Sequence, residues 1–490
     1  MKRMVLRIFI AFFVLIVILL SVVLIRTVRL KSRQLQVEPI ADIEIKSNTA
    51  AEHLAEAVKF KTISFQDRSA IQEQEFLAFH QFLEEAFPHV HSKLQKEVIG
   101  DLSLLFTWEG QNQELKPILI IAHMDVVPVE PGTEEDWIHP PFQGNIADGY
   151  IWGRGAVDDK GSLIGILEAV EWLLERDYQP RRTVYLGFGH DEEVGGIKGA
   201  LQIADHLDSR NVELEYVHDE GLVIISGAMP GISKPVAMVG IAMKGYLSLE
   251  LLVESEGGHS SMPGKETSIG ILSSALHRLG KRQIPTKIEL PVQQMFNYVA
   301  PEMKFFMKMV FANQRLFGGM IKKNLATKPS SNALVRTIMA PTIFEGGEKE
   351  NILPKKARAI VNFRTLPGTR NEDIIEHVQG SIKDPRVKIR AIQEFQTEPS
   401  SVSDVESPGF GVLHKTIQQI FPDVVVAPGL VLGAADSRHY AKLSENIYMI
   451  VPYRFIPEEV SMVHGTNERV SIKNYVEVIR FYVQLIRNST

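Results

Sequence analysis

Histidine and acidic residues follow several strand-like stretches of this chain. His123 directly follows the apolar stretch 117–122, and Glu192 and Glu193 closely follow the apolar stretch 183–189. Neighbouring carboxylates at the end of an apolar strand repel one another unless protons or a cation neutralise them. The chain has no cysteine, so histidine and carboxylates are the strong metal ligands that it offers. The pattern therefore indicates a metal site made of imidazole and carboxylate groups.

Three further motifs have the same character. The motif WGRGAVDDKG contains Asp158, the motif HDEG contains Asp219, and the motif MVHGTNE near the C-terminus contains His464. Each motif alone is also consistent with a structural role, such as a capped turn or a solvated loop. Together they outline one metal centre, and the number and type of ligands suit two zinc ions that share a carboxylate.

The segments that must position these motifs alternate between helical and strand-like patterns. Residues 52–59, 73–86 and 161–175 have helical periodicity, and the apolar stretches 117–122 and 183–189 are typical of buried strands. This alternation predicts a doubly wound α/β sheet with helices on both faces. In such sheets the functional residues gather at the carboxyl ends of the strands, which is where these motifs fall.

Length and composition limit the class of protein. With 490 residues the chain is too long for a single compact core, and its 45% hydrophobic and 23% charged residues are typical of globular proteins. The net charge of -6 gives no reason to expect a nucleic-acid partner, which would require a basic surface.

The N-terminus contains an apolar segment. Residues 8–25 are uncharged and almost entirely apolar, and basic residues flank them on both sides. This length is close to what a bilayer requires, and we interpret the segment as a retained signal anchor within residues 1–30. The alternatives are a cleaved signal peptide and a buried helix of a soluble core. The polar residues 31–45 are then expected to form a stalk.

The five motifs, in the order HMD, GRGAVDDKG, HDEEVGG, HDEG and HGTNE, resemble those of the co-catalytic zinc exopeptidases of clan MH. This family includes aminoacylase, carboxypeptidase S and glutamate carboxypeptidase, and the resemblance extends from about residue 45 to the end. It implies a catalytic domain in two parts, 46–239 and 367–490. A lid and dimerisation domain of α+β type is expected between them, at 240–366.

The resemblance also implies roles for particular residues. One zinc ion would be held by His123, Asp158 and Asp219, and the other by Asp158, Glu193 and His464. Glu192 would be the general base, Asp125 would orient His123, and the Asp158–Asp159 peptide bond would be cis. Glu220 follows Asp219 directly and is within reach of the metal as well, but the register favours Asp219.

In the lid, the motif GGHSSMPG resembles the family's histidine motif. His259 would then stabilise the oxyanion in the active site of the partner subunit of a homodimer. Asn332 and Arg364 match lid positions that face the substrate, and Arg438 would face the substrate carboxylate. For the arginines the alternative is a surface ion pair of under about 1 kcal/mol.

The activity implied is hydrolysis of an amide bond, reversible in principle. The N-terminal segment and the long lid most resemble the branch that contains carboxypeptidase S and the N-fatty-acyl amino acid hydrolase/synthases. We therefore expect N-acyl, and specifically N-fatty-acyl, amino acids as substrates, with the catalytic domain on the extracytoplasmic or lumenal side. Met303, Phe306, Met307 and Val310 have helical spacing, so one apolar face would belong to the lid core or line an acyl groove. The alternatives are a carboxypeptidase acting on short peptides and a catalytically silent binding protein.

Overall fold

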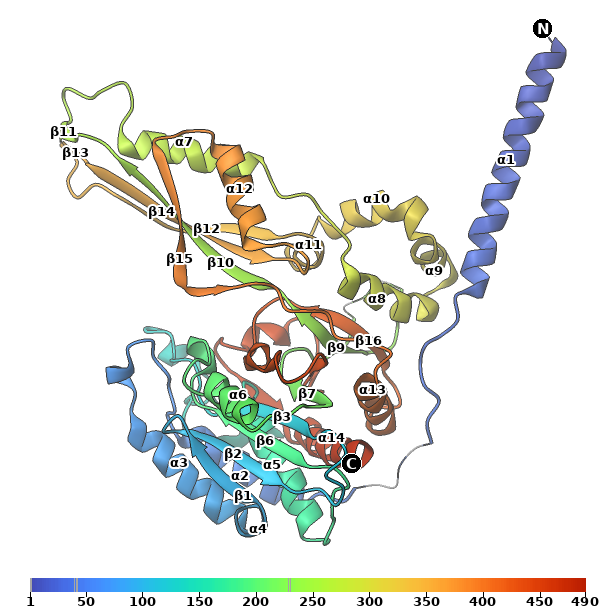
Figure 1. Cartoon of the computed structure of the whole chain (residues 1–490), viewed down its shortest axis with the longest axis vertical. Helices are drawn as coiled ribbons and strands as arrows, with labels where there is room; N and C mark the ends of the chain where they lie inside the picture. Colours follow the sequence, from blue (N-terminus) through green and yellow to red (C-terminus); the bar gives the residue numbers. More distant parts are fainter. Residues whose placement is uncertain (1, 39, 41–42, 228, 230) are drawn as a thin grey trace.

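A mixed sheet of largely buried strands forms the main body of the molecule (Figure 1). The computed structural model describes residues 2–38, 40, 43–227, 229 and 231–490, and within these residues the sheet has ten strands. Their order is β1-β2-β6-β3-β7-β17-β9-β8-β18, with β16 paired to β9. The strands are β1 (Gln95–Ile99), β2 (Ser103–Trp108), β3 (Ile118–His123), β6 (Val184–Gly189), β7 (Tyr216–Asp219), β8 (Ile224–Ile225), β9 (Val236–Met243), β16 (Val425–Val431), β17 (Ile447–Met449) and β18 (Arg454–Phe455). Strand β3 runs parallel to both β6 and β7, so the carboxyl ends of these three strands meet at one edge.

Helices cover both faces of this sheet. Along β3, Ile118 and Ile120 belong to one apolar core, and Leu119 and Ile121 belong to a second core on the opposite face. The first core includes residues of α2 (Ser47–Lys59), α3 (Glu73–Ala86), α4 (Pro88–Lys93), α5 (Lys160–Leu174), α13 (Pro408–Ile420) and α14 (Ile472–Ser489). The second core includes residues of α6 (Ala200–Ser209). The predicted doubly wound α/β body is confirmed.

A small three-stranded sheet joins two of the sequence motifs. It contains β4 (Asn145–Ala147), β5 (Tyr150–Trp152) and β19 (Arg469–Ser471), in the order β19-β5-β4. Strand β5 leads into the loop that carries Asp158, and β19 follows the loop that carries His464. Pairing of β5 with β19 therefore brings together two motifs that lie more than 300 residues apart.

A second sheet stands apart from the main body (Figure 1). It is antiparallel, with the order β12-β14-β10-β15, and its strands are β10 (Gly245–Glu254), β12 (Ile338–Gly346), β14 (Lys356–Thr365) and β15 (Val387–Thr397). Helices α7 (Ser268–Lys281) and α12 (Asn371–Ile382) pack against one face. The short pair β11 (Gly258–His259) and β13 (Ile352–Leu353) lies at the end remote from the main sheet (Figure 1). The expected boundary at 366 falls short of this sheet, because β15 pairs with β10 from a later part of the chain.

Four helices lie between α7 and β12: α8 (Leu290–Val299), α9 (Phe305–Ala312), α10 (Gln314–Leu325) and α11 (Pro329–Val335). Helix α9 begins only at Phe305, so Met303 lies outside it. Met303 and Val310 are buried in the core of the main body, whereas Phe306 is 68% exposed. Of the four residues in the predicted apolar stripe, Met303, Met307 and Val310 lie in or against this core, whereas Phe306 does not, so the prediction is wrong for Phe306.

The N-terminal helix α1 (Lys2–Arg29) projects from the body beside α9 and α10 (Figure 1). Its residues Arg3–Arg29 are long and apolar enough to cross a membrane, and nearly all of its apolar side chains are exposed. Near its C-terminal end, Val23 and Thr27 are buried. Of the expected stalk, residues 39, 41 and 42 lie outside the described residues.

Candidate metal centre and active site

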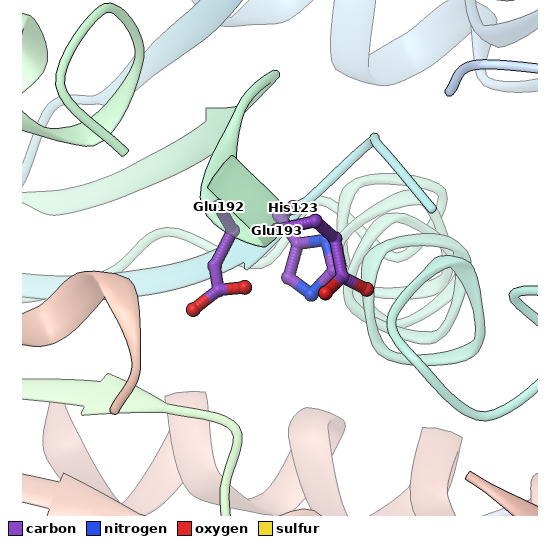
Figure 2. A group of neighbouring side chains, drawn as sticks. All are labelled: His123, Glu192 and Glu193. Carbon is purple, nitrogen blue, oxygen red and sulfur yellow. The ribbon is translucent and has the colours of Figure 1, made fainter. Parts of the chain in front are cut away.

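The sequence motifs meet at the carboxyl edge of the main sheet, as predicted. His123 is the last residue of β3, and the turn η3 (Glu192–Val194) follows β6. Figure 2 shows the side chains of Glu192 and Glu193, which leave this turn, next to the His123 ring. One potential ligand atom from each of these three residues lies within 4.8 Å of the others, a spacing compatible with a shared metal ion.

Asp158, Glu193 and His464 form a second group within the same limit. His464 Nε2 lies 3.0 Å from Asp158 Oδ2 and 3.2 Å from Glu193 Oε1. These are the three residues expected for one of the two zinc ions. The other oxygen of Asp158, Oδ1, lies 3.1 Å from His123 Nε2, so Asp158 stands between the two histidines as a bridging ligand would.

A neighbour of the predicted ligand Asp219 lies beside His123 and Asp158. In the described part of the chain, Glu220 forms a group with His123 and Asp158, and Asp219 is in no such group. The Asp219 oxygens instead accept hydrogen bonds from the backbone N–H groups of Glu220, at 2.8 Å, and Ser437, at 2.9 Å. Glu220 is therefore a second candidate for this position, Asp219 stays a predicted ligand, and the Asp219 carboxylate also contacts the loop that contains Ser437.

Asp125 contacts both His123 and the turn η3. Its Oδ1 lies 3.3 Å from His123 Nδ1, and its two oxygens accept hydrogen bonds from the backbone N–H groups of Glu192 and Glu193, each at 3.1 Å. The Ser64 hydroxyl also donates to Asp125, a contact that the sequence reasoning missed. Asp125 thus lies where it can orient both the histidine ligand and the turn with Glu192. The Asp158–Asp159 peptide bond is cis, as expected.

Several acidic side chains of this centre are buried close to one another, which disfavours their negatively charged forms. Burial, followed by the charges of Asp158, Asp159 and Asp219, raises the pKa of Glu220 well above its usual range. Burial likewise raises the pKa of Glu192 and of Glu193. Hydrogen bonds with Asp158 and then Glu193 raise the pKa of His464 to about 10. Burial therefore disfavours the charged forms of Glu192, Glu193 and Glu220, which a bound cation would favour. The carboxylates offer oxygen and the two imidazoles offer nitrogen, and both are donors of the kind that zinc accepts.

A buried ion pair that the sequence reasoning also missed supports the two ligand loops. Arg154 Nη1 donates to Glu468 Oε2 at 2.6 Å, and Arg154 Nη2 donates to the His464 carbonyl at 3.1 Å. Glu468 Oε1 accepts hydrogen bonds from the backbone N–H groups of Gly155, Val157 and Asp158. Arg154 and Glu468 belong to the sequence motifs GRGAVDD and HGTNE. Their contact becomes evident only from the pairing of β5 with β19.

The two arginines expected to face substrate lie close together. Arg438 Nη2 donates to the Gly195 carbonyl at 2.6 Å, directly beside η3. The pKa of Arg364 is lowered by burial and then by the charge of Arg438, and its guanidinium lies over the Tyr246 ring, 4.6 Å from the centroid. Asn332 accepts a hydrogen bond from Arg336 at 3.0 Å. Arg438 therefore places positive charge beside the acidic centre, and Arg364 lies within reach of the charge of Arg438. Asn332 contacts neither of them through a hydrogen bond within the described residues.

His259 does not join the cluster in this chain. It lies in β11, is exposed, and within the described residues its ring forms hydrogen bonds with the nearby Ser261, at 2.7 Å to the hydroxyl. Figure 1 shows β11 at the end of the second sheet remote from β3 and β6.

A doubly wound sheet with a shared-carboxylate His/Asp/Glu centre at its carboxyl edge defines a metal-dependent amidohydrolase or peptidase. The chain belongs to peptidase family M20/M25/M40, whose model matches residues 119–488. It is 43% identical to the probable carboxypeptidase S-like 2 of Dictyostelium discoideum, covering 97% of this chain and 92% of that protein. It is 41% identical to the N-fatty-acyl-amino acid synthase/hydrolase PM20D1 of Xenopus tropicalis, covering 98% and 94%.

Solved structures agree on the fold. The M20 family metallo-carboxypeptidase Sso-CP2 of Sulfolobus solfataricus superposes with a TM-score of 0.63, over 91% of this chain and 99% of that one, at 18% identity. The family and the enzymatic class expected from the motif order are confirmed.

Proposed function

We propose that this protein is a dizinc amidohydrolase that cleaves, reversibly, the amide bond of N-fatty-acyl amino acids. The observation that carries the proposal is the pair of ligand groups that share Asp158. His123, Asp158 and Glu220 would hold one zinc ion, and Asp158, Glu193 and His464 the other. When bound, the ions would lower the pKa of water and polarise the scissile carbonyl.

Glu192 is the proposed general base. It lies beside His123 and Glu193, and its raised pKa brings the carboxyl closer to the range in which it can accept a proton from water and return it to the leaving amine. Asp125 holds the backbone of the turn that carries Glu192 and so fixes the position of the base relative to the ligands.

The positive groups near the centre suit a substrate with a free carboxylate. Arg438 and Arg364 are proposed to bind the carboxylate of the amino acid, with Asn332 as a polar contact to the substrate. An amino acid product and a C-terminal residue of a peptide share this carboxylate, so these residues do not separate the two substrate classes.

Similarity to PM20D1 at 41% identity over nearly the full length supports the fatty-acyl class, and the similarity to carboxypeptidase S-like 2 supports peptides as the second candidate. An anchor in the membrane favours the first, because lipidic substrates partition there. We propose that α1 is a retained anchor with the catalytic domain on the extracytoplasmic or lumenal side. We further propose that the chain forms a homodimer in which His259 of one subunit stabilises the oxyanion at the site of the other.

A series of acyl chains from acetyl to oleoyl on one amino acid tests the substrate. Each additional buried CH₂ contributes about 0.8 kcal/mol, which is roughly fourfold in kcat/KM until the acyl site is filled. Elemental analysis for two zinc ions per chain is the accompanying measurement. A flat series, with dipeptides cleaved equally well or better, would replace the fatty-acyl proposal with the carboxypeptidase. Absence of zinc together with absence of hydrolysis would leave the silent binding protein.

A further inference from the structure

The helices α9 and α10 present an unusual number of apolar side chains to solvent. Phe306 is joined by Phe305 at 58% exposure, Leu316 at 51% and Met320 at 47%. Contiguous exposed apolar side chains of this kind mark surfaces that bind a protein or a membrane. Since Met303 and Val310 anchor this segment in the core, the phenylalanines face outward on a fixed base.

All charged residues of the same segment are basic. Residues 304–328 contain six lysine or arginine side chains and no aspartate or glutamate, although the whole chain carries a net charge of -6. Within the described residues, no ion pair neutralises any of the six. They are Lys304, Lys308, Arg315, Lys322, Lys323 and Lys328. Aromatic residues interleaved with lysine and arginine are typical of helices that lie in the headgroup region of a bilayer.

The position of α9 and α10 relative to α1 indicates that a bilayer covers their exposed apolar side chains. Asn313, at the junction of α9 and α10, is buried, and its amide donates to the Val23 carbonyl at 3.2 Å and to the Thr27 hydroxyl at 3.4 Å. The apolar run of α1 ends at Ile25, followed by Arg26 and Arg29. The contact therefore fixes α9 and α10 at the level where the apolar part of α1 gives way to charged residues. In Figure 1 both helices lie beside the part of α1 nearer the body.

We infer that α9 and α10 form a second membrane contact, in which Phe305 and Phe306 enter the interface of a bilayer and the basic residues contact anionic headgroups. This inference rests on the proposed membrane anchor α1. In addition to the anchor, helices α8 to α11 would then hold the main body against the bilayer surface, and residues 31–45 would not be its only link to the membrane.

Brominated lipids, which quench tryptophan emission from within the acyl region, test this arrangement in the full chain. The chain carrying Phe306→Trp is reconstituted into phosphatidylcholine vesicles with phosphatidylserine, with and without brominated acyl chains. Val98→Trp is the matched control, because Val98 is 53% exposed in β1, on the opposite side of the molecule from α1 (Figure 1). The four native tryptophans, Trp108, Trp137, Trp152 and Trp172, give a common background.

We expect the added emission of Phe306→Trp to fall at least about twofold in brominated vesicles, and that of Val98→Trp to stay unchanged. Adding Lys304→Glu and Arg315→Glu to the Phe306→Trp chain should weaken quenching in phosphatidylserine vesicles, with a smaller effect at high salt. Flotation of the chain with the vesicles reports the anchor separately.

Equal quenching of the two tryptophan variants in chains that float would overturn the second contact while leaving the anchor intact. A Phe306→Trp emission that is already blue-shifted without vesicles would show that protein covers this face, and would also overturn it. A chain that does not float overturns both the anchor and this contact, whereas hydrolysis of acyl amino acids is unaffected by either result.

Discussion

The ion pair between Arg154 and Glu468 is predicted to support the metal centre. Both side chains are buried, and the pair joins the loop of Asp158 to the loop of His464. Replacing Arg154 by Met keeps most of the volume but leaves the Glu468 carboxylate without its partner. Breaking a buried pair in this way costs about 3–5 kcal/mol, because an uncompensated charge stays inside the protein.

The loss should also reach the metal. Three backbone N–H groups in the loop of Asp158 donate to Glu468, so a shift of that side chain should move Asp158, the proposed bridging ligand. Supporting residues of this kind contribute about 10–100-fold to metal affinity. We expect Arg154→Met to lose that much affinity for zinc in a chelator competition, and to lower the free energy of unfolding in urea titrations followed by tryptophan fluorescence.

A double variant and a surface pair complete the design. Arg154→Met with Glu468→Gln should recover most of the stability, because a neutral amide still accepts hydrogen bonds from the backbone. Arg386→Met is the control, since Arg386 is about half exposed where it pairs with Asp384 at 2.8 Å and with Glu266 at 2.7 Å, and exposed pairs contribute under about 1 kcal/mol each. If Arg154→Met were as mild as Arg386→Met and bound zinc normally, the supporting role would be refuted.

Four further outcomes are expected. Glu192→Gln should lower kcat by about 10²–10⁴-fold in the hydrolysis assay at unchanged zinc content, and retained activity would exclude Glu192 as the base. Glu220→Gln should weaken zinc binding more than Asp219→Asn does, and the reverse order in elemental analysis would restore Asp219 as the ligand. Inactive His259→Ala and Glu192→Gln chains should regain activity when mixed and exchanged into hybrid dimers, and no recovery despite proven exchange would exclude action across subunits. Burial lowers the pKa of Lys244 to about 7, from 10.5 in the unfolded chain. Between these pH values the unfolded chain binds more protons, so the free energy of unfolding rises with pH. Lys244→Met should remove up to about 1.4 kcal/mol per pH unit of that rise, measured by urea titrations at several pH values.

The parts of the site that the sequence could predict are those that follow from strand ends. His123 ends one buried strand and the Glu192–Glu193 pair closely follows another, and parallel neighbours place such residues at one edge whatever the details of packing. The choice between Asp219 and Glu220 does not follow in this way. It depends on contacts from distant parts of the chain, such as the hydrogen bond that the backbone N–H of Ser437, more than 200 residues later, donates to one oxygen of Asp219.

Other features depend on contacts that no local pattern encodes. The second sheet extends past the expected boundary at 366, because β15 is defined by its pairing with β10 rather than by composition. The role of the Arg154–Glu468 pair depends on the register of β5 and β19. Helical spacing grouped Phe306 with Met303 and Val310, but helix α9 begins after Met303. Which side chains of α9 are exposed depends on the elements that it packs against.

The position of His259 bears directly on whether one chain completes its own site. Strand β10 continues from β9 through Lys244, whose buried amine donates to the carbonyls of Ala333 and Arg336 at 2.9 and 2.8 Å. Pairing of β10 with β14 along ten residues then carries the second sheet away from the main body, with β11 at its remote end (Figure 1). Bringing His259 to His123 of the same chain would require both the Lys244 contacts and the direction of this sheet to change. The proposed oxyanion contact from a second subunit requires neither change, so the exposed position of His259 is compatible with the role that the motif resemblance implies.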